Sequence, residues 1–248
     1  MHGVADIISV LFISFCFILS AFTFSFAGFG FALVAVPLMA IVLPIKTAVA
    51  LQFPFGLILV VYNVLKYSKN INLVKLWPFF VGAAVAAPVG FVALNWFPEA
   101  IMKQALALLI VLSILSSRLP WTEKRARHFA KSKLAGGLFG LLSGWFFGAY
   151  TIGGPPAVIY FKAKEADPIK IKGIIAIYFL VTDMFISGLL CYSGILNKEI
   201  FFQAVGYAPP AIIGSLIGVL AFKKISAKGY LPAVDILLFI AAILLCIR

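Results

Sequence analysis

The feature of this sequence that most constrains its fold is a series of long apolar runs separated by short polar or basic breaks. Several runs reach about 20 residues with almost no charge, which is the length an α-helix needs to cross roughly 30 Å of hydrocarbon. With 64% hydrophobic and 11% charged residues, the chain lies outside the range of soluble globular domains. It is therefore predicted to be an all-α integral membrane protein.

The apolar runs between these breaks predict about ten helical segments. In chain order they are 4–26, 31–44, 47–66, 74–95, 99–117, 133–151, 155–163, 171–192, 199–222 and 230–247. The second and seventh segments would form helices of only about 21 Å and 14 Å, so neither can span a bilayer alone. Both follow directly after a glycine-containing break.

The two glycine-containing breaks share one pattern, in which an apolar helix runs into glycine and a short apolar run follows. The first is LSAFTFSFAGFG, residues 19–30, and the second is LSGWFFGAYTIGGPP, residues 142–156. At an offset of 123, the residues that coincide are Leu19 with Leu142, Ser20 with Ser143, Phe24 with Phe147, and Gly30 with Gly153. Glycine permits a sharp turn, and proline favours a new helix start, so each stretch is predicted to be a helix broken inside the membrane.

The basic residues predict which side of the membrane each loop occupies. Of the 20 Lys and Arg residues, 16 fall in four loops: 66–75, 118–133, 162–172 and 223–228. Placing these loops in the cytoplasm leaves both termini outside. Each half of the chain then makes an odd net number of crossings, so the two halves have opposite orientations. Such an inverted repeat is typical of secondary transporters.

Further matches at an offset of 124 favour a duplication: Pro44-Ile-Lys46 recurs as Pro168-Ile-Lys170, and Gly82 and Gly90 recur as Gly206 and Gly214. The predicted organisation is an N-terminal repeat of five segments (1–117), a basic cytoplasmic linker (118–132) and a C-terminal repeat of five segments in inverted orientation (133–248). Each repeat opens with a glycine-broken helix pair.

These motifs resemble those of the TauE/SafE family of membrane permeases, which is named for sulfite export. The first copy is Gly28-Phe-Gly30-Phe31 with Pro37, and the second is Gly148-Ala-Tyr-Thr-Ile-Gly-Gly-Pro155. The run Gly214-Ser-Leu-Ile-Gly218 and the following Lys223 to Gly229 are similar to the closing segments of the family. The resemblance implies two related halves and a cargo such as sulfite or an organosulfonate. Phe29, Phe31 and Tyr160 depart from the family pattern, which bears on the cargo rather than on the fold.

The two short helices are predicted to begin inside the membrane and to run toward opposite faces, so their N-termini would meet near the midplane. Helix N-termini carry free N–H groups and partial positive charge, and this suits an anion without a buried Lys or Arg. The candidate substrate-binding residues at the breaks are Gly28, Gly30, Gly153, Gly154 and Pro155, with the nearby Ser20, Ser25, Ser143, Tyr150 and Thr151. Polar residues that would line the route are Gln52, Asn63 and Thr182.

A structural alternative stands beside each of these assignments. Glycines also allow close helix packing, which is the expected role of Gly82, Gly90, Gly206, Gly214 and Gly218. Serine and threonine in membrane helices usually bond their own backbone. Asp183 lies in the middle of the eighth segment, where an acid is costly; it would either carry a coupling proton or stabilise helix contacts. Leu59 stands at the matching place in the first half, so a proton role would be asymmetric.

The function predicted from these features is a secondary transporter, an exporter of a small anion working by alternating access in the cell membrane. An anion channel and a non-transporting accessory protein are the alternatives. The chain is not expected to be an enzyme or to hold a cofactor or metal, because His2 and His128 lie outside the predicted membrane segments and no nucleotide motif is present. The net charge of +12 lies in membrane loops, so no nucleic acid is expected as a partner. The predicted partners are the lipid bilayer, the anion and, as a coupling ion, the proton; the sequence carries no signal of oligomeric state.

Overall fold

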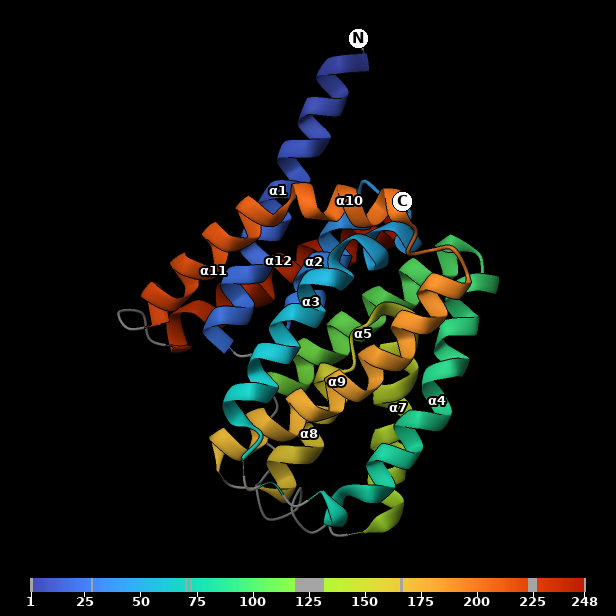
Figure 1. Ribbon diagram of the computed structural model, residues 1–248, viewed down its shortest axis with the longest axis vertical. Coiled ribbons are helices and arrows are strands. Elements are labelled where there is room, and N and C mark those ends of the chain that lie inside the picture. Colours follow the sequence, from blue (N-terminus) through green and yellow to red (C-terminus); the bar gives the residue numbers. More distant parts are fainter. Residues whose placement is uncertain are drawn as a thin grey trace. The chain divides into compact units, whose positions relative to one another are not determined.

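A computed structural model describes residues 2–27, 29–69, 71, 73–118, 132–165, 167–222 and 227–247 (Figure 1). Within these ranges the chain is helical and contains no strand. The elements are α1 (His2–Ala27), α2 (Phe31–Met39), α3 (Ile45–Tyr67), η1 (Val74–Leu76), α4 (Trp77–Trp96), α5 (Glu99–Arg118), α7 (Lys133–Tyr150), α8 (Gly154–Lys164), α9 (Pro168–Tyr192), α10 (Lys198–Gly206), α11 (Ala208–Phe222) and α12 (Ala227–Ile247). The predicted all-α fold is confirmed. Gly28 and residues 119–131 of the predicted linker lie outside the described residues.

One predicted segment is wrong, because residues 199–222 form two helices rather than one. The chain bends by 48° between α10 and α11. Pro209 and Pro210 follow the bend directly. Neither can donate a backbone hydrogen bond, and their rings would clash with the carbonyls one turn earlier if the helix continued. The two prolines therefore end α10 and start α11.

Four stretches are long and apolar enough to cross a membrane: residues 7–25 of α1, all of α3, η1 with α4, and α9. The bent pair of α10 and α11 would make a fifth. Helix α4 exposes an apolar face suited to contact with lipid: Val81, Val85, Val89 and Val92 are exposed along one stripe. The valine stripe thus faces outward on α4, and the buried side is mainly glycine and alanine, with Phe79, Phe91 and Leu94 among them.

The described chain divides into two compact units, and each takes helices from both halves of the sequence. Unit 1 comprises residues 1–55, 98–111 and 195–248. Unit 2 comprises residues 56–97 and 112–194. The two units are described separately below.

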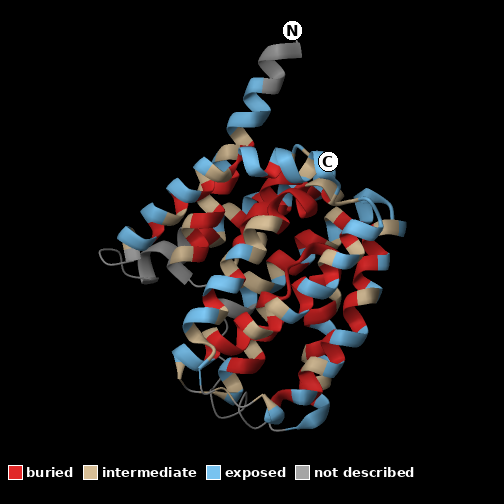
Figure 2. Cartoon of the chain, viewed as in Figure 1, coloured by how far each residue is buried: buried red, intermediate tan, exposed pale blue. Residues whose placement is uncertain are grey.

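Unit 2 is built on the contact between α4 and α7, which run side by side over most of their lengths (Figure 1). Glycine makes this approach possible. A Cβ at Gly90 of α4 would overlap the backbone carbonyl of Trp145, and one at Gly144 of α7 would overlap that of Ala83. The facing sides of both helices are buried (Figure 2). Gly82 and Gly90 therefore serve as packing glycines, as the sequence predicted.

Unit 1 repeats this arrangement with different helices, because α1 packs along α11. A Cβ at Gly214 would overlap the carbonyl of Ile18, and one at Gly218 would lie 2.7 Å from the carbonyl oxygen of Phe22. The predicted packing role of Gly206 is wrong, since this residue is exposed with nothing within 4 Å of an added Cβ. In both units, the first helix of one half of the sequence packs against the fourth predicted segment of the other half.

Candidate substrate site at the two broken helices

The second break, in unit 2, has the backbone geometry of a helix end followed at once by a helix start. Thr151 caps α7 in the left-handed conformation, with φ 58°, and its N–H donates to the carbonyl of Phe147 at 2.7 Å. Gly153 is the N-cap of α8, and Gly154 is the first residue of that helix. Pro155 and Pro156 fit the first turn because the amides of a first turn lack helical partners. The break predicted at this position is confirmed.

Two buried hydroxyls hold this break in place. Ser143, two turns before the end of α7, donates from Oγ to the carbonyl oxygen of Gly153 at 2.6 Å. The hydroxyl of Tyr178 on α9 lies 2.9 Å from Ser143 Oγ. Because Ser143 has a single proton and gives it to Gly153, its oxygen is left to accept from Tyr178. A chain of hydrogen bonds therefore ties α9 to α7 and to the start of α8.

Gly153 has no room for a side chain. An added Cβ would lie 2.8 Å from the ring of Phe147, 2.9 Å from the Tyr178 hydroxyl and 3.0 Å from the carbonyl oxygen of Ser143. All of these groups are buried. Glycine is therefore required at position 153 because a side chain would have no space. The backbone conformation does not require it, since φ −99° is open to any residue.

An aromatic cluster surrounds Tyr178. Its ring meets those of Phe79, Phe147 and Phe161 at centroid distances of 5.0, 5.9 and 6.5 Å. Tyr160 stacks on Phe79 at 5.4 Å. Such clusters are rigid because close-packed rings cannot rotate freely. These apolar rings thus surround Tyr178 and keep its hydroxyl beside that of Ser143.

A small cavity of about 210 Å³ lies between α4 and α9 beside this cluster. Tyr178 and Thr182 contribute its polar side chains, and the remaining walls are apolar, with Phe80, Ala87 and Phe185 among them. The Thr182 hydroxyl donates to the carbonyl of Tyr178 at 2.7 Å, which is the backbone role expected of a helical threonine. The volume is several times the roughly 30 Å³ of one water molecule, so a small ion fits.

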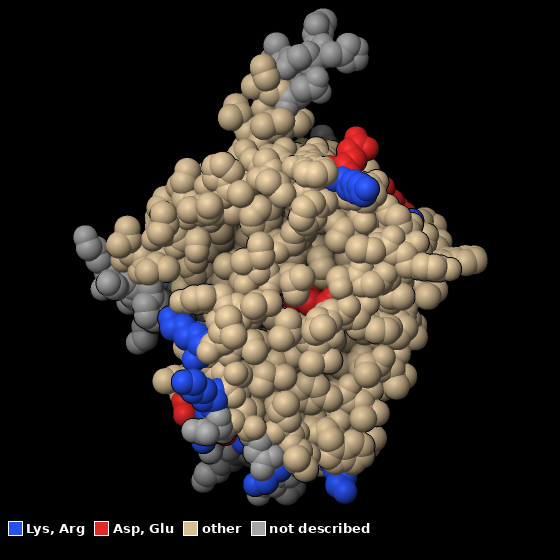
Figure 3. Space-filling view, viewed as in Figure 1, with Lys and Arg blue, Asp and Glu red and all other residues tan. Residues whose placement is uncertain are grey.

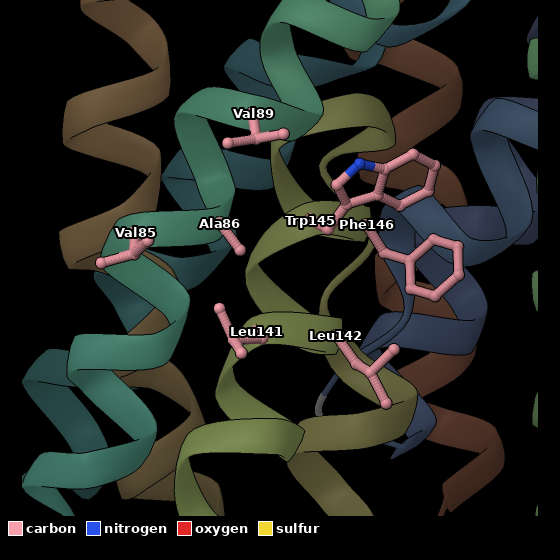
Figure 4. A pocket seen from close by; sticks show the side chains of 7 residues that line it. All are labelled: Val85, Ala86, Val89, Leu141, Leu142, Trp145 and Phe146. Atoms are coloured by element: carbon pink, nitrogen blue, oxygen red, sulfur yellow. The ribbon is translucent and has the colours of Figure 1, made fainter.

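A larger groove of about 340 Å³ between α4 and α7 is chemically different (Figure 4). Valine, alanine, leucine, tryptophan and phenylalanine side chains line it: Val85, Ala86, Val89, Leu141, Leu142, Trp145 and Phe146. An ion placed there would lose its hydration without gaining partners. This groove suits a lipid chain and not an anion.

The first break, in unit 1, uses glycine for a different reason. Gly30 adopts φ 95° and ψ 13°, and it is the N-cap of α2. Its carbonyl accepts the first helical hydrogen bond, from the N–H of Val34 at 3.2 Å. An added Cβ would meet nothing closer than 4.0 Å. Backbone conformation, not space, selects glycine here.

The hydroxyls predicted at the first break are engaged elsewhere. Ser20 is fully buried and donates to the carbonyl of Cys16 in its own helix at 2.6 Å. The hydroxyls of Ser25 and Ser215 lie 2.7 Å apart, joining α1 to α11. Phe31, the first residue of α2, packs against Phe17 with ring centroids 6.0 Å apart. Neither of these two hydroxyls therefore bonds to the backbone of the described part of this break, as Ser143 does at the other break.

A family model described as sulfite exporter TauE/SafE matches residues 13–245, nearly the whole chain. The chain belongs to the TauE/SafE family. No curated protein and no solved structure matches it. TauE/SafE proteins are transporters of the sulfite-exporter type, so this chain is a multi-pass membrane transporter.

The remaining polar residues predicted for this TauE/SafE protein are buried in separate parts of the chain. In unit 1, Gln52 is 1% exposed and donates from Nε2 to the carbonyl of Val49 at 3.2 Å. In unit 2, Asn63 is buried on α3 and Tyr150 is buried at the end of α7. The ring of Tyr150 contacts those of Trp145 and Phe146.

Asp183 is the buried acid of α9 in this transporter, with 5% of its surface exposed. Among the described residues, no group donates a hydrogen bond to its carboxyl and no cation pairs with it. It follows Thr182, which lines the small cavity, and lies within one and a half turns of Tyr178. A buried carboxyl inside a membrane helix is normally functional.

Tyr178 is the residue that sequence reasoning missed. It precedes Thr182 by four residues, so the two lie on one face of α9. A tyrosine in the middle of an apolar span, one turn from a threonine, is the signal that could have marked it, because a buried hydroxyl needs a partner. The described residues contain no group of three or more His, Cys, Asp or Glu side chains placed to hold a metal ion.

Proposed function

We propose that this TauE/SafE protein exports a small anion, sulfite or an organosulfonate, across the cell membrane by alternating access. The anion is held at helix N-termini that follow a backbone break, near the membrane midplane. The observation that carries the proposal is the pair of helices that start after a backbone break within long apolar segments. In membrane transporters, such helix starts form binding sites for anionic groups.

Backbone groups, not cations, would bind the anion. Helix α2 contains no Lys or Arg, and in α8 the basic residues are confined to the last turn. Free N–H groups and the helix dipole attract negative charge without the cost of burying a lysine. The buried hydroxyls of Ser143 and Tyr178 would position the start of α8, and the lack of a side chain at Gly153 lets them pack directly against it.

Reciprocal packing supports the inverted-repeat part of this proposal. Helix α1 packs on α11 and helix α7 packs on α4, so the opening helix of each half pairs with a late helix of the other. In transporters built from inverted repeats, alternating access is a motion of one repeat relative to the other. With the basic loops in the cytoplasm, both termini lie outside.

Export of an anion needs no ATP under this proposal. A negative interior drives each negative charge outward with about 2.3 kcal/mol per 100 mV. Coupling to protons is an addition to this driving force, and Asp183 is the residue proposed to carry it.

The proposal is tested by flux from liposomes that contain the purified protein and radiolabelled sulfite. We expect release that saturates with internal sulfite and is competed by an organosulfonate. Release that rises linearly without saturation would favour an anion channel. Absence of flux with sulfite, sulfonates, sulfate and phosphate would remove the transport proposal and favour an accessory role.

Asp183→Asn tests the proton role separately. If the carboxyl carries a proton during the cycle, the substitution should flatten the pH dependence of sulfite flux between about pH 5 and 8 while sulfite binding persists. Leu59→Asn, at the matching place in the first half, is the control and should leave the pH profile unchanged. An unaltered profile in Asp183→Asn would retire proton coupling through this residue.

A further inference from the structure

A second polar pocket lies in unit 2, away from the broken helix. It has a volume of about 310 Å³ and lies where η1, the end of α8 and the start of α9 come together. Lys75, Lys164 and Lys170 line it, each from a different one of these elements. Lys and Arg side chains gather at this end of unit 2 (Figure 3). Lys164 ends α8, so the pocket is about 15 Å from the start of that helix.

The positive charge of the pocket is only partly balanced by the described part of the chain, since three lysines and one glutamate line it. None of its three lysines forms an ion pair with a described carboxylate. Glu165 also lines the pocket, but its carboxylate accepts a hydrogen bond from the N–H of Asp167 at 3.1 Å. The carboxylate of Asp167 in turn caps α9 by accepting from the N–H of Ile169 at 2.9 Å. The acids here stabilise the α8–α9 connection, and the lysines are left in excess.

Lys164 is an exposed residue whose side chain is only slightly withdrawn from water. Burial lowers its pKa below the ordinary lysine value, and its ammonium lies 5.8 Å from the centre of the Tyr160 ring. An ammonium group with reduced hydration gains more from a counterion than a fully exposed one. Lysine side chains around a pocket present ammonium donors that match the oxygens of a phosphate group.

The remainder of the pocket is apolar. Ile71, Leu76 and Ile174 line it beside the lysines. The combination of basic and apolar walls at the predicted cytoplasmic ends of membrane helices is the chemistry that recognises a phosphorylated head group with its attached glycerol and acyl carbons.

We propose that this pocket binds a phosphate group through Lys75, Lys164 and Lys170, supplied either by an anionic phospholipid or by free phosphate. The pocket is separate from the proposed export site, so this inference does not depend on the cargo. A lipid phosphate held there would fix the end of α8 and the start of α9 at the cytoplasmic surface.

The test measures binding by the purified full chain in nanodiscs and in detergent. Phosphatidylglycerol, phosphatidylethanolamine and inorganic phosphate are the three probes, and retained ligand is quantified by native mass spectrometry. The pocket variant carries Lys75→Gln, Lys164→Gln and Lys170→Gln. The control variant carries Lys69→Gln, Lys133→Gln and Lys162→Gln, three exposed lysines of the same unit that do not line the pocket.

We expect the pocket variant to lose at least about tenfold in affinity and the control less than about threefold, because only the pocket lysines converge on one phosphate group. Selective retention of phosphatidylglycerol identifies the lipid as the source, and retention of inorganic phosphate identifies the soluble ion. Equal losses in the two variants, or binding of none of the three probes to the unaltered protein, would overturn the proposal. If the pocket variant does not fold, the single change Lys164→Gln compared with Lys162→Gln decides the same question.

Discussion

The two broken helices share a sequence pattern but reach their geometry by different means. At the break between α1 and α2, Gly30 takes the left-handed conformation, and a Cβ there would have space. At the break between α7 and α8, Thr151 takes the left-handed conformation, and Gly153 has ordinary φ but no space. Aligned glycines thus serve conformation in one break and close packing in the other. Equivalent positions in a repeat need not have equivalent physical roles.

The two helix starts also differ as hydrogen-bond donors. In α2, the first turn comprises Phe31, Ala32 and Leu33, all of which have backbone N–H groups. In α8, Pro155 and Pro156 occupy the second and third positions and have none. The start of α8 therefore offers an anion the amides of Gly153 and Gly154, whereas α2 offers a full first turn. As an anion site, the start of α2 would therefore act mainly through hydrogen bonds and the start of α8 mainly through its dipole.

The largest expected effect comes from filling the space at Gly153. Gly153→Leu should reduce sulfite flux by at least about 100-fold, because moving the buried Phe147 ring and the Tyr178 hydroxyl costs on the order of 3 kcal/mol. Membrane insertion should persist. Gly188→Leu is the matched control, since Gly188 is an exposed glycine of α9 with nothing within 4 Å of an added Cβ. Flux that survives Gly153→Leu would remove α8 from the proposed site.

Substitution of Gly30 should have a smaller effect with a different pattern. Gly30→Ala forces a Cβ into the left-handed region, at a cost of about 1–2 kcal/mol, and should lower flux roughly tenfold. Gly30→Asn should recover most of this loss, because asparagine adopts that region more readily. At Gly153, where space is the constraint, asparagine should be no better than alanine. Flux assays on the four variants compare the breaks directly, and rescue by asparagine at both positions would contradict the distinction.

Ser20 and Ser143 occupy aligned positions but should differ in their effect on stability. Ser143→Ala removes the side-chain donor to the Gly153 carbonyl and the acceptor for Tyr178, so it should cost about 1–3 kcal/mol of unfolding free energy. Ser20→Ala removes only a bond to the carbonyl of Cys16 in the same helix, and the change should stay within about 0.5 kcal/mol. Unfolding in sodium dodecyl sulfate measures both. Equal losses would mean that the two hydroxyls are equivalent after all.

The sequence predicted the helices well because length and apolarity in a membrane are local properties of the chain. It also predicted both breaks, since glycine and proline restrict the backbone wherever they occur. It failed where partners come from distant segments. The contact of Ser143 with Tyr178, the pairing of Ser25 with Ser215 and the open surroundings of Gly206 depend on which helices pack together, and periodicity does not encode that. The bend before Pro209 was readable in principle, but the continuous apolar run from 199 to 222 concealed it.

The smallest effect is expected at Thr151, where it separates a backbone role from a ligand role. A β-branched residue at φ 58° is strained, so Thr151→Gly should raise the unfolding free energy by up to about 1 kcal/mol. Thr151→Val keeps this strain and loses the hydrogen bond from the hydroxyl to the Tyr150 carbonyl, so it should lower the unfolding free energy by about 1 kcal/mol. Both variants lack the hydroxyl. If that hydroxyl binds the anion, the KM for sulfite should rise in both; if Thr151 only turns the chain, KM should stay constant in Thr151→Gly. Flux and unfolding measured on the same pair of variants therefore decide whether Thr151, the left-handed residue of this break, contacts the cargo. The same test cannot be made at the other break, because its left-handed residue, Gly30, has no side chain.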